Sequence, residues 1–355
     1  MTLKNFKEKD FIKTILSKYA TTANKNNFDD CICIDLQDLL GIENLPYLVY
    51  SIDHPSFIKR KGMDRNEQYK FYGAWAAACT CGDILAMGTM PKGFSFDLSA
   101  PIDTEINDIE LIMKGILNTL NFYGAKFEGG NIDVNNLETV CMAWGLVKRD
   151  KIIRRIGAKS SDYIVATADL GVGWACYLIE KFGLEEKLPN VIVKKIREYK
   201  KIPTANVKAM QEVFELEGAI TSGMDLTDGL IEFLYTVSEN NNLRVEVDYK
   251  ELPVSDFLKI LSEVLGFDAK LMCFSPGYDT PLSHGWTIDK NHIEDVKYIF
   301  KKHGGELNIY GRVLEGQGVK LINKDNRIKD IPLFYDDQFN SENLIEDFKN
   351  IIRNL

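Results

Sequence analysis

The chain has 355 residues, of which 45% are hydrophobic and 27% are charged, a composition typical of globular proteins that are long enough for two domains. Its formal net charge is −9, and no long Lys/Arg run is interleaved with aromatic residues, which argues against nucleic acid as the main partner. No apolar run approaches the roughly 20 residues that a membrane span needs. The first ten residues also lack the apolar segment of a signal peptide, so we expect a cytoplasmic protein without membrane contact.

The seven cysteines include two C-x-C pairs, Cys31/Cys33 and Cys79/Cys81. This spacing differs from the C-x-x-C of zinc ribbons and of thioredoxin-like redox sites. In the alternating apolar run Cys31-Ile32-Cys33-Ile34, cysteine is expected to act as a small core residue. We therefore predict reduced, buried thiols.

The first part of the chain alternates between helical and extended hydrophobic periods. The helical period predicts an amphipathic helix over residues 6–19 and a buried helix over residues 69–89, with a charged loop over residues 57–70 before the second. The other elements expected here are a helix over residues 105–122 and strands over residues 31–35, 47–53, 93–99 and 139–147.

The basic and polar stretch 148–162 is where we place the domain boundary, because a strand and a Gly-containing turn follow it over residues 163–171. The later elements expected are helices over residues 172–183, 189–198, 203–214, 255–265 and 292–303 and strands over residues 244–249 and 307–314. The chain is thereby divided into a lead-in (1–27), a first domain (28–150), a second domain (151–330) and a tail (331–355).

Two carboxylates lie three residues apart in the second domain, Asp225 and Asp228, with Thr227 between them. The apolar residues that follow recur at helical spacing, so we expect these acids where a loop turns into a helix. Thr227 or Asp228 is a plausible N-cap, and capping is the ordinary structural role of such residues. A functional role depends on what the other acidic loops do.

Familiar catalytic motifs are absent from the sequence: there is no Walker A loop, no G-x-G-x-x-G, no G-x-S-x-G and no zinc-spaced histidine pair. What remains is a set of acids at turns or among small residues: Asp29, Asp30, Asp53, Asp83, Asp133, Asp225, Asp228 and Asp279. Hard cations such as Mg²⁺ take oxygen ligands and bridge carboxylates to substrate phosphates. An acidic chain can hold a nucleotide in this way, provided that the fold brings its acids together.

Two further stretches bear on this question. Asp83 lies among apolar and small residues of the expected helix, and because burying an unpaired carboxylate is costly, it should face a polar cleft or bind something positive. Gly129-Gly130 follows a strand-like run and permits either a tight backbone near a ligand or an ordinary turn.

Several motifs, taken in order, carry a family resemblance: Asp29-Asp30 before a strand, Ser51–Asp53, Cys81–Gly88 with Pro91, Gly129–Asn131, Gly157–Gly171, Met224–Leu230, Gly277–Asp279 and, more weakly, Tyr335–Phe339. They resemble the ATP-binding superfamily of aminoimidazole ribonucleotide (AIR) synthetase, selenophosphate synthetase, HypE and thiamine-monophosphate kinase, and most closely the last. The resemblance covers about residues 28–340.

This resemblance implies an α+β, two-domain PurM-like fold, with an N-terminal mixed α/β domain that forms a homodimer and a C-terminal α+β sandwich domain. It implies ATP and Mg²⁺ as cofactors, a small-molecule phosphoryl acceptor, and phosphorylation of thiamine monophosphate to the diphosphate. The implied metal ligands are Asp29, Asp30, Asp53, Asp83, Asp225 and Asp228. The implied nucleotide-binding residues are Gly129, Gly130, Asn131, Asp133, Thr227 and Asp279, and the catalytic group is Asp225, Thr227 and Asp228.

Departures from the kinase pattern fall mainly on the acceptor side. Asn131 replaces an acid, Tyr278 stands where an acid precedes Asp279, and the segment His54–Arg60 does not match the kinase's acceptor-binding stretch. The sequence is therefore compatible with an acceptor other than thiamine monophosphate. The alternatives are an AIR-synthetase-like ATP-dependent ligase or cyclase and a non-catalytic nucleotide-binding dimer.

Overall fold

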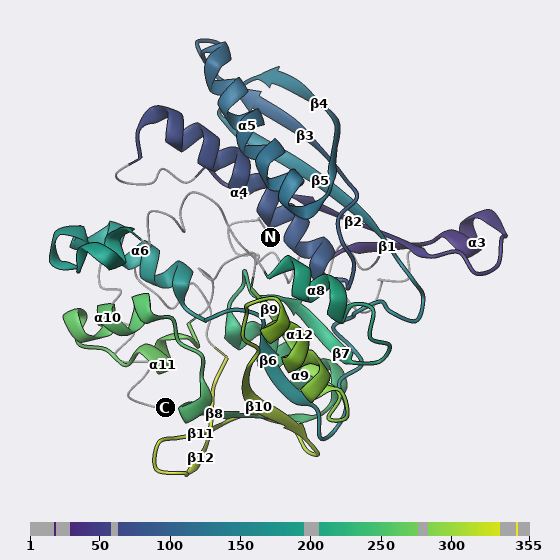
Figure 1. Cartoon of the computed structure of the whole chain (residues 1–355), viewed down its shortest axis with the longest axis vertical. Coiled ribbons are helices and arrows are strands. Elements are labelled where there is room, and N and C mark those ends of the chain that lie inside the picture. Colours follow the sequence, from purple (N-terminus) through teal and green to yellow (C-terminus); the bar gives the residue numbers. More distant parts are fainter. Residues whose placement is uncertain are drawn as a thin grey trace.

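The structure is a computed structural model, and it describes Lys18, residues 29–57, 63–194, 206–275 and 283–333, and Glu346. Figure 1 shows two sheets that lie one beyond the other along the long axis, each with its own helices. The predicted helix 6–19, the stretch Gly277–Asp279 and the motif Tyr335–Phe339 lie outside the described residues, apart from Lys18. None of the described helices is both long and apolar enough to cross a membrane.

The first sheet has five strands, and all neighbouring pairs are antiparallel except β3 and β4. In spatial order they are β1 (Ile32–Asp35), β2 (Tyr47–Asp53), β5 (Glu138–Val147), β3 (Gly93–Ala100) and β4 (Lys126–Val134).

Two long helices, α4 (Arg65–Ala86) and α5 (Ile106–Tyr123), cover one face of this sheet (Figure 1). They cross at very close range, since a Cβ on Gly73 or on Gly115 would lie 2.0 Å from a backbone oxygen of the other helix. Small residues at the crossing therefore set the depth to which α4 packs.

No helix of the described residues covers the other face of the first sheet, which we call the open face. Side chains along β5 alternate strictly between buried and exposed, as expected for a strand with one covered face. Cys141 and Ala143 point toward the helices, whereas Val140, Met142 and Leu146 are exposed. The open face is therefore apolar along its middle strand.

The second sheet has seven strands and is covered on both faces. In spatial order the strands are β12 (Ile328–Asp330), β11 (Gly318–Ile322), β8 (Arg244–Asp248), β10 (Asn308–Leu314), β6 (Tyr163–Ala166), β9 (His284–Ile288) and β7 (Ile220–Asp225). One face packs against α6 (Val172–Phe182), α9 (Leu230–Asn241), α10 (Asp256–Leu265) and α11 (Ala269–Met272).

On its other face, the second sheet packs against α8 (Val207–Val213) and α12 (Ile293–Lys302). These helices belong to the same apolar cluster as the core under α4 and α5, with Ile153 and Trp286 among its fully buried members. The two domains therefore share one continuous core at their junction.

Most expected strands and helices are confirmed, with β2 matching its predicted bounds. The charged loop over residues 57–70 is wrong in its second half, because α4 already begins at Arg65. A capping box explains this start: the Asp64 carboxylate accepts the Glu67 N–H, and the Glu67 side chain accepts the Asp64 N–H. Thiol burial is also confirmed, since all seven cysteines are free and six are buried.

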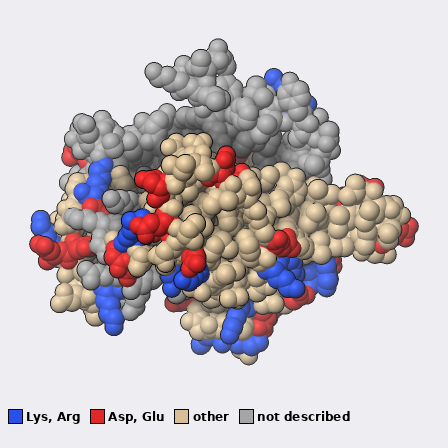
Figure 2. Space-filling view, turned by 90° about the horizontal axis from the view of Figure 1, so that it is seen from above, with Lys and Arg blue, Asp and Glu red and all other residues tan. Residues whose placement is uncertain are grey.

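Elements that the sequence did not predict include α3 (Leu36–Leu40), capped by Asp35, and the strands β9, β11 and β12. The hairpin from β1 through α3 to β2 projects from the body in Figure 1, and Figure 2 shows the same projecting arm from above with few charged side chains. The double glycine is not a turn, because Gly129 and Gly130 both lie within β4, next to a register shift.

The stretch around Asp225 also differs from expectation. A strand precedes it, since β7 ends at Asp225, and α9 begins at Leu230. The N-cap is Gly229, which has φ 91°, and no side chain caps the helix. The N-cap prediction for Thr227 or Asp228 is therefore wrong, and both side chains are left for other contacts.

Candidate metal and nucleotide site

The acids at the start of the first domain meet the arginines that follow its last strand. Arg154 Nη1 lies 2.7 Å from Asp29 Oδ2, and the Arg155 N–H donates to Asp29 Oδ1 at 3.0 Å. Arg155 Nε donates to Asp30 Oδ1 at 3.0 Å. Both carboxylates are almost completely buried, so these ion pairs lie in the interior where the two domains meet.

Asp30 also touches the second domain. Its Oδ2 accepts the backbone N–H of Asp225 at 3.3 Å, at the end of β7. The Thr227 hydroxyl donates to the buried carboxylate of Asp225, while Asp228 is exposed. The segment therefore carries a buried carboxylate, Asp225, next to Asp30 and a solvent-accessible one, Asp228, three residues further on.

Asp83 and Asp53 approach from the covered face of the first sheet. Ser51 Oγ donates to Asp83 Oδ2 at 2.5 Å. Ser51 and Asp53 lie two residues apart on β2, so both side chains point to the same side as Asp83, which lies on α4. Ser51 belongs to the Ser51–Asp53 motif, but the sequence assigned it no role of its own; its distance of two residues from Asp53 on a strand is the signal that could have given one.

Burial and mutual repulsion shift the pKa values of these acids upward. Burial raises the pKa of Asp30 to about 6, and the nearby Asp225 adds to this while Arg155 opposes it. Burial, with the charge of Asp228, also raises the pKa of Asp225 to about 6. Burial and the charges of Asp225, Asp30 and Asp53 raise the pKa of Asp83 well above its ordinary value.

Five carboxylates from the two domains thus share one region, and Arg155 neutralises only part of their charge. Buried like charges are costly unless a cation compensates them, and carboxylate oxygens are the ligands that Mg²⁺ prefers. The donor set therefore fits Mg²⁺. Among the described residues, no group of three or more His, Cys, Asp or Glu side chains is arranged to hold a metal ion.

Both oxygens of Asp29 are engaged by the Arg154–Arg155 segment. Both oxygens of Asp30 are engaged as well, by Arg155 and by the backbone N–H of Asp225. Their predicted roles as metal ligands stay predictions, and so does the nucleotide-binding role of Asp279 outside the described residues.

The Gly129–Asp133 stretch is not brought to the cluster within one chain. Asn131 and Asp133 project from the open face of β4, and Asn131 Nδ2 donates to Asp97 Oδ1 at 3.1 Å. Two strands separate β4 from β2, so this stretch lies about 14 Å or more from Asp53. The predicted nucleotide contacts of Gly129, Gly130, Asn131 and Asp133 stay predictions.

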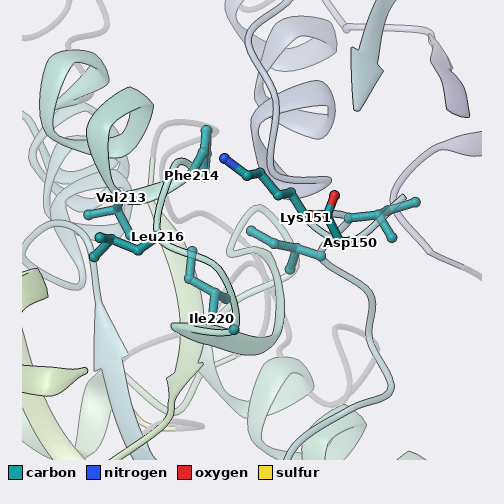
Figure 3. Close-up of a pocket in the computed structure, with 9 residues that line it drawn as sticks. Asp150, Lys151, Val213, Phe214, Leu216 and Ile220 are labelled. Atoms are coloured by element: carbon teal, nitrogen blue, oxygen red, sulfur yellow. The ribbon is translucent and has the colours of Figure 1, made fainter. Parts of the chain in front are cut away.

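Sequence reasoning assigned Arg154 and Arg155 to the linker and did not pair them with Asp29 and Asp30, which lie 125 positions earlier. A separate pocket lies at the same junction, where Figure 3 shows Lys151 extending past Phe214. It is lined by residues of the linker, α8 and the start of β7, and Asp150 is its one carboxylate among them. It is therefore distinct from the acid cluster.

Comparison with known proteins places the chain in a family. The N-terminal domain model of "AIR synthase related protein" matches residues 28–147, and the C-terminal domain model matches residues 159–324. Because both models match in order over most of the chain, the protein belongs to the AIR synthase related proteins, with the PurM-like two-domain fold.

Among its relatives, thiamine-monophosphate kinase from Pyrococcus horikoshii is 26% identical over 307 residues, which cover 86% of this chain and 88% of the relative. The structure of AaThiL complexed with AMPPCP and TMP matches with a TM-score of 0.73 at 20% identity, covering 92% and 96% of the two chains. A HypE–HypF complex structure gives 0.71 at 15% identity, covering 91% and 99%. At these identities the structural matches show the fold alone.

Proposed function

We propose that the protein is an ATP- and Mg²⁺-dependent phosphotransferase. The observation that carries this proposal is the meeting of Asp30, Asp53 and Asp83 from the first domain with Asp225 and Asp228 from the second. Phosphoryl transfer needs little covalent chemistry from the protein and depends on positioning and on charge neutralisation. A cluster of carboxylates from both domains is suited to that task once cations are bound.

In this proposal the five carboxylates hold Mg²⁺, with the exposed Asp228 nearest to solvent. Bound Mg²⁺ supplies charge neutralisation on the phosphate oxygens of ATP. Thr227 orients the Asp225 carboxylate through its hydroxyl, and Ser51 does the same for Asp83. We assign Arg155 to the phosphates as a second source of positive charge. Burial alone would lower the pKa of its guanidinium, but the carboxylates of Asp30, Asp225 and Asp228 outweigh that effect and keep it protonated.

The acceptor that we propose is thiamine monophosphate. Support comes from the curated relatives, which are named thiamine-monophosphate kinases, and from the similarity to AaThiL complexed with AMPPCP and TMP. The segment His54–Phe57, which differs from the kinase pattern, belongs to the stretch expected to bind the acceptor. Its Phe57 ring packs against Tyr72 and Tyr69, with ring centroids 5.0 and 6.0 Å apart. That segment is therefore held to α4 by aromatic contacts.

We further propose that the protein works as a homodimer through the open face of the first sheet. Ile52, Val140, Met142 and Leu146 are exposed there on adjacent strands, and Ile52 retains 60% of its accessible surface. An apolar sheet face without a covering layer is the kind of surface that a second copy buries. In such a dimer, the exposed Asn131 and Asp133 would lie at the subunit contact.

The test is product analysis with ATP, Mg²⁺ and thiamine monophosphate. Thiamine diphosphate with stoichiometric ADP supports the proposal. Free phosphate with a cyclised or ligated product points instead to AIR-synthetase-like chemistry. Tight calorimetric binding of ATP and Mg²⁺ with no turnover on any acceptor points to a non-catalytic nucleotide-binding dimer.

A further inference from the structure

His284 is a buried polar side chain at the point where the second domain meets α4. It is the first residue of β9, and it is completely inaccessible to solvent. Its Nε2 lies 3.0 Å from the carbonyl oxygen of Gly82, a residue of the first domain. Because a carbonyl oxygen only accepts hydrogen bonds, Nε2 carries the hydrogen atom of the ring and donates it across the junction.

In the second domain, His284 is fixed to the strand that carries Asp225. The two residues are direct partners in the β7–β9 register. The His284 N–H donates to Thr167 Oγ1 at 2.9 Å, and the His284 carbonyl accepts the Thr167 N–H at 3.0 Å. The backbone of His284 is therefore fixed to the β7–β9 pair, so its position relative to α4 is coupled to that of Asp225.

On the other side of the junction, Gly82 is bonded directly to Asp83. The same turn of α4 is held by the Cys31 thiol, which donates to the Asp83 carbonyl at 3.2 Å, and by the Ser51 contact with the Asp83 carboxylate. The Asp83 carbonyl is one of those that a helix end leaves without an intrahelical partner, so the thiol contact satisfies it. Asp83 is thus fixed to the first sheet and, through Gly82, to His284.

We propose that His284 is a positioning residue that sets the separation between the first-domain carboxylate Asp83 and the second-domain carboxylate Asp225. Asp83 and Asp225 are linked by one peptide unit, one hydrogen bond and one strand pairing. If cations bind between these carboxylates, the hydrogen bond and the cations favour the same arrangement of the domains, and each strengthens the other. The proposal rests on the proposed function for the identity of the ligand.

The test compares His284→Phe, which keeps a ring but loses the donor, with His284→Gln, which keeps a donor at similar reach. Calorimetry with Mg²⁺ and a non-hydrolysable ATP analogue should give a dissociation constant about tenfold higher in His284→Phe, the effect of one buried hydrogen bond. His284→Gln should stay within about threefold of the wild type. In kinetics, KM for ATP should rise more than kcat falls in the Phe variant.

A second measurement needs no ligand. Amide hydrogen exchange in the metal-free protein should be about tenfold faster in His284→Phe for the peptides around Gly82 and Leu226, and His284→Gln should restore it. His303→Phe is the matched control, because it removes a histidine contact (Nε2 to Glu212 Oε2, 2.7 Å) that lies wholly within the second domain. It should change neither measurement at the junction.

Equal exchange and equal dissociation constants in the Phe and Gln variants would overturn the positioning role. So would an effect of His303→Phe as large as that of His284→Phe, because the loss would then reflect general destabilisation. If the wild type itself bound no Mg²⁺ and nucleotide, the proposed function would fail, whereas the exchange measurement would still decide whether His284 fixes the junction.

Discussion

In the first sheet, one face is covered by α4 and α5 and the other is open, whereas the second sheet is covered by helices on both faces. The burial patterns record this difference: β5 alternates residue by residue, while all five residues of β9 are buried. The covered face of the first sheet carries Ser51, Asp53 and α4 with Asp83, so the proposed chemistry and the proposed dimer contact use opposite sides of one sheet. The second sheet instead carries Asp225 and His284 on the paired strands β7 and β9 at one of its edges.

The largest effect is expected from a change on the covered face of the first sheet. Asp83→Asn should lower turnover by about a thousandfold or more, because it removes a carboxylate from the cation-binding set while keeping the shape of the side chain. The fold should persist, since neutralising a buried acid removes repulsion from Asp225 and Asp30. Steady-state kinetics and a circular dichroism melt measure the two outcomes. Asp330→Asn, an exposed position on β12, is the control and should match the wild type.

The second sheet should be the more sensitive of the two to loss of packing. Phe233 is fully buried on α9, and its ring lies against the backbone of Gly285 in β9. Phe233→Ala should lower the free energy of unfolding by about 3–5 kcal/mol, through lost burial and an unfilled cavity. Val140→Ala, on the open face, should cost less than about 1 kcal/mol in the monomer. Similar losses in urea denaturation of monomeric backgrounds would contradict the contrast between the sheets.

A charge on the open face should separate subunits without unfolding them. Met142→Glu is expected to raise the dimer dissociation constant by about a hundredfold or more, because a carboxylate would be buried without a partner. Ile328→Glu is a matched control, since Ile328 is an exposed apolar residue on the edge strand of the second sheet. Light scattering after gel filtration distinguishes dimer from monomer, and a wild type that is monomeric at micromolar concentration would refute the dimer proposal.

The smallest effect concerns pH. The pKa values of Asp30 and Asp225 are raised to about 6 in the folded protein, so the folded state binds more protons than the unfolded state between about pH 4 and 6. The stability that these groups contribute is complete below about pH 4 and is lost as the pH rises through 6. The free energy of unfolding of the metal-free protein should therefore rise by on the order of 2 kcal/mol between pH 7 and pH 5.

The matched variant for this measurement is Asp225→Asn, which cannot take up the proton. The difference in unfolding free energy between wild type and variant isolates the contribution of Asp225, and it should shrink as the pH falls. Mg²⁺ should stabilise the wild type more at pH 7 than at pH 5, because its carboxylate ligands must be deprotonated. A pH-independent difference between the two proteins would contradict the assigned pKa shift.

How far sequence reasoning succeeded follows from the same contrast between the sheets. The strands β2 and β5 are runs of seven and ten residues rich in apolar side chains, and both were predicted. The strand β9 was missed because a fully buried segment shows no alternation and is short. The capping-box pair Asp64 and Glu67 does indicate the start of α4, but the charged residues around it led to the prediction of a loop.

The acids themselves were identified from sequence, but their convergence depended on the family resemblance and could not come from spacing. Asp30 and Asp225 are 195 positions apart, and no local rule relates them. At the start of α9, by contrast, a local rule gave the wrong answer. Thr and Asp are usual N-cap residues, so the cap was predicted at Thr227 or Asp228. The cap is Gly229 instead, whose positive φ favours glycine.

The pairs Asp29–Arg154 and Asp30–Arg155 bring the first residues of the first domain together with the residues that directly follow it. The path through this domain is therefore nearly a closed ring, with its entry and exit locked together by two ion pairs. Chains with this property tolerate being cut and rejoined elsewhere. A chain cut at the α3 turn should keep its fold, because the two ion pairs still hold the entry of this domain to its exit, whereas separating Asp30 from Arg155 would open the ring where the domains meet.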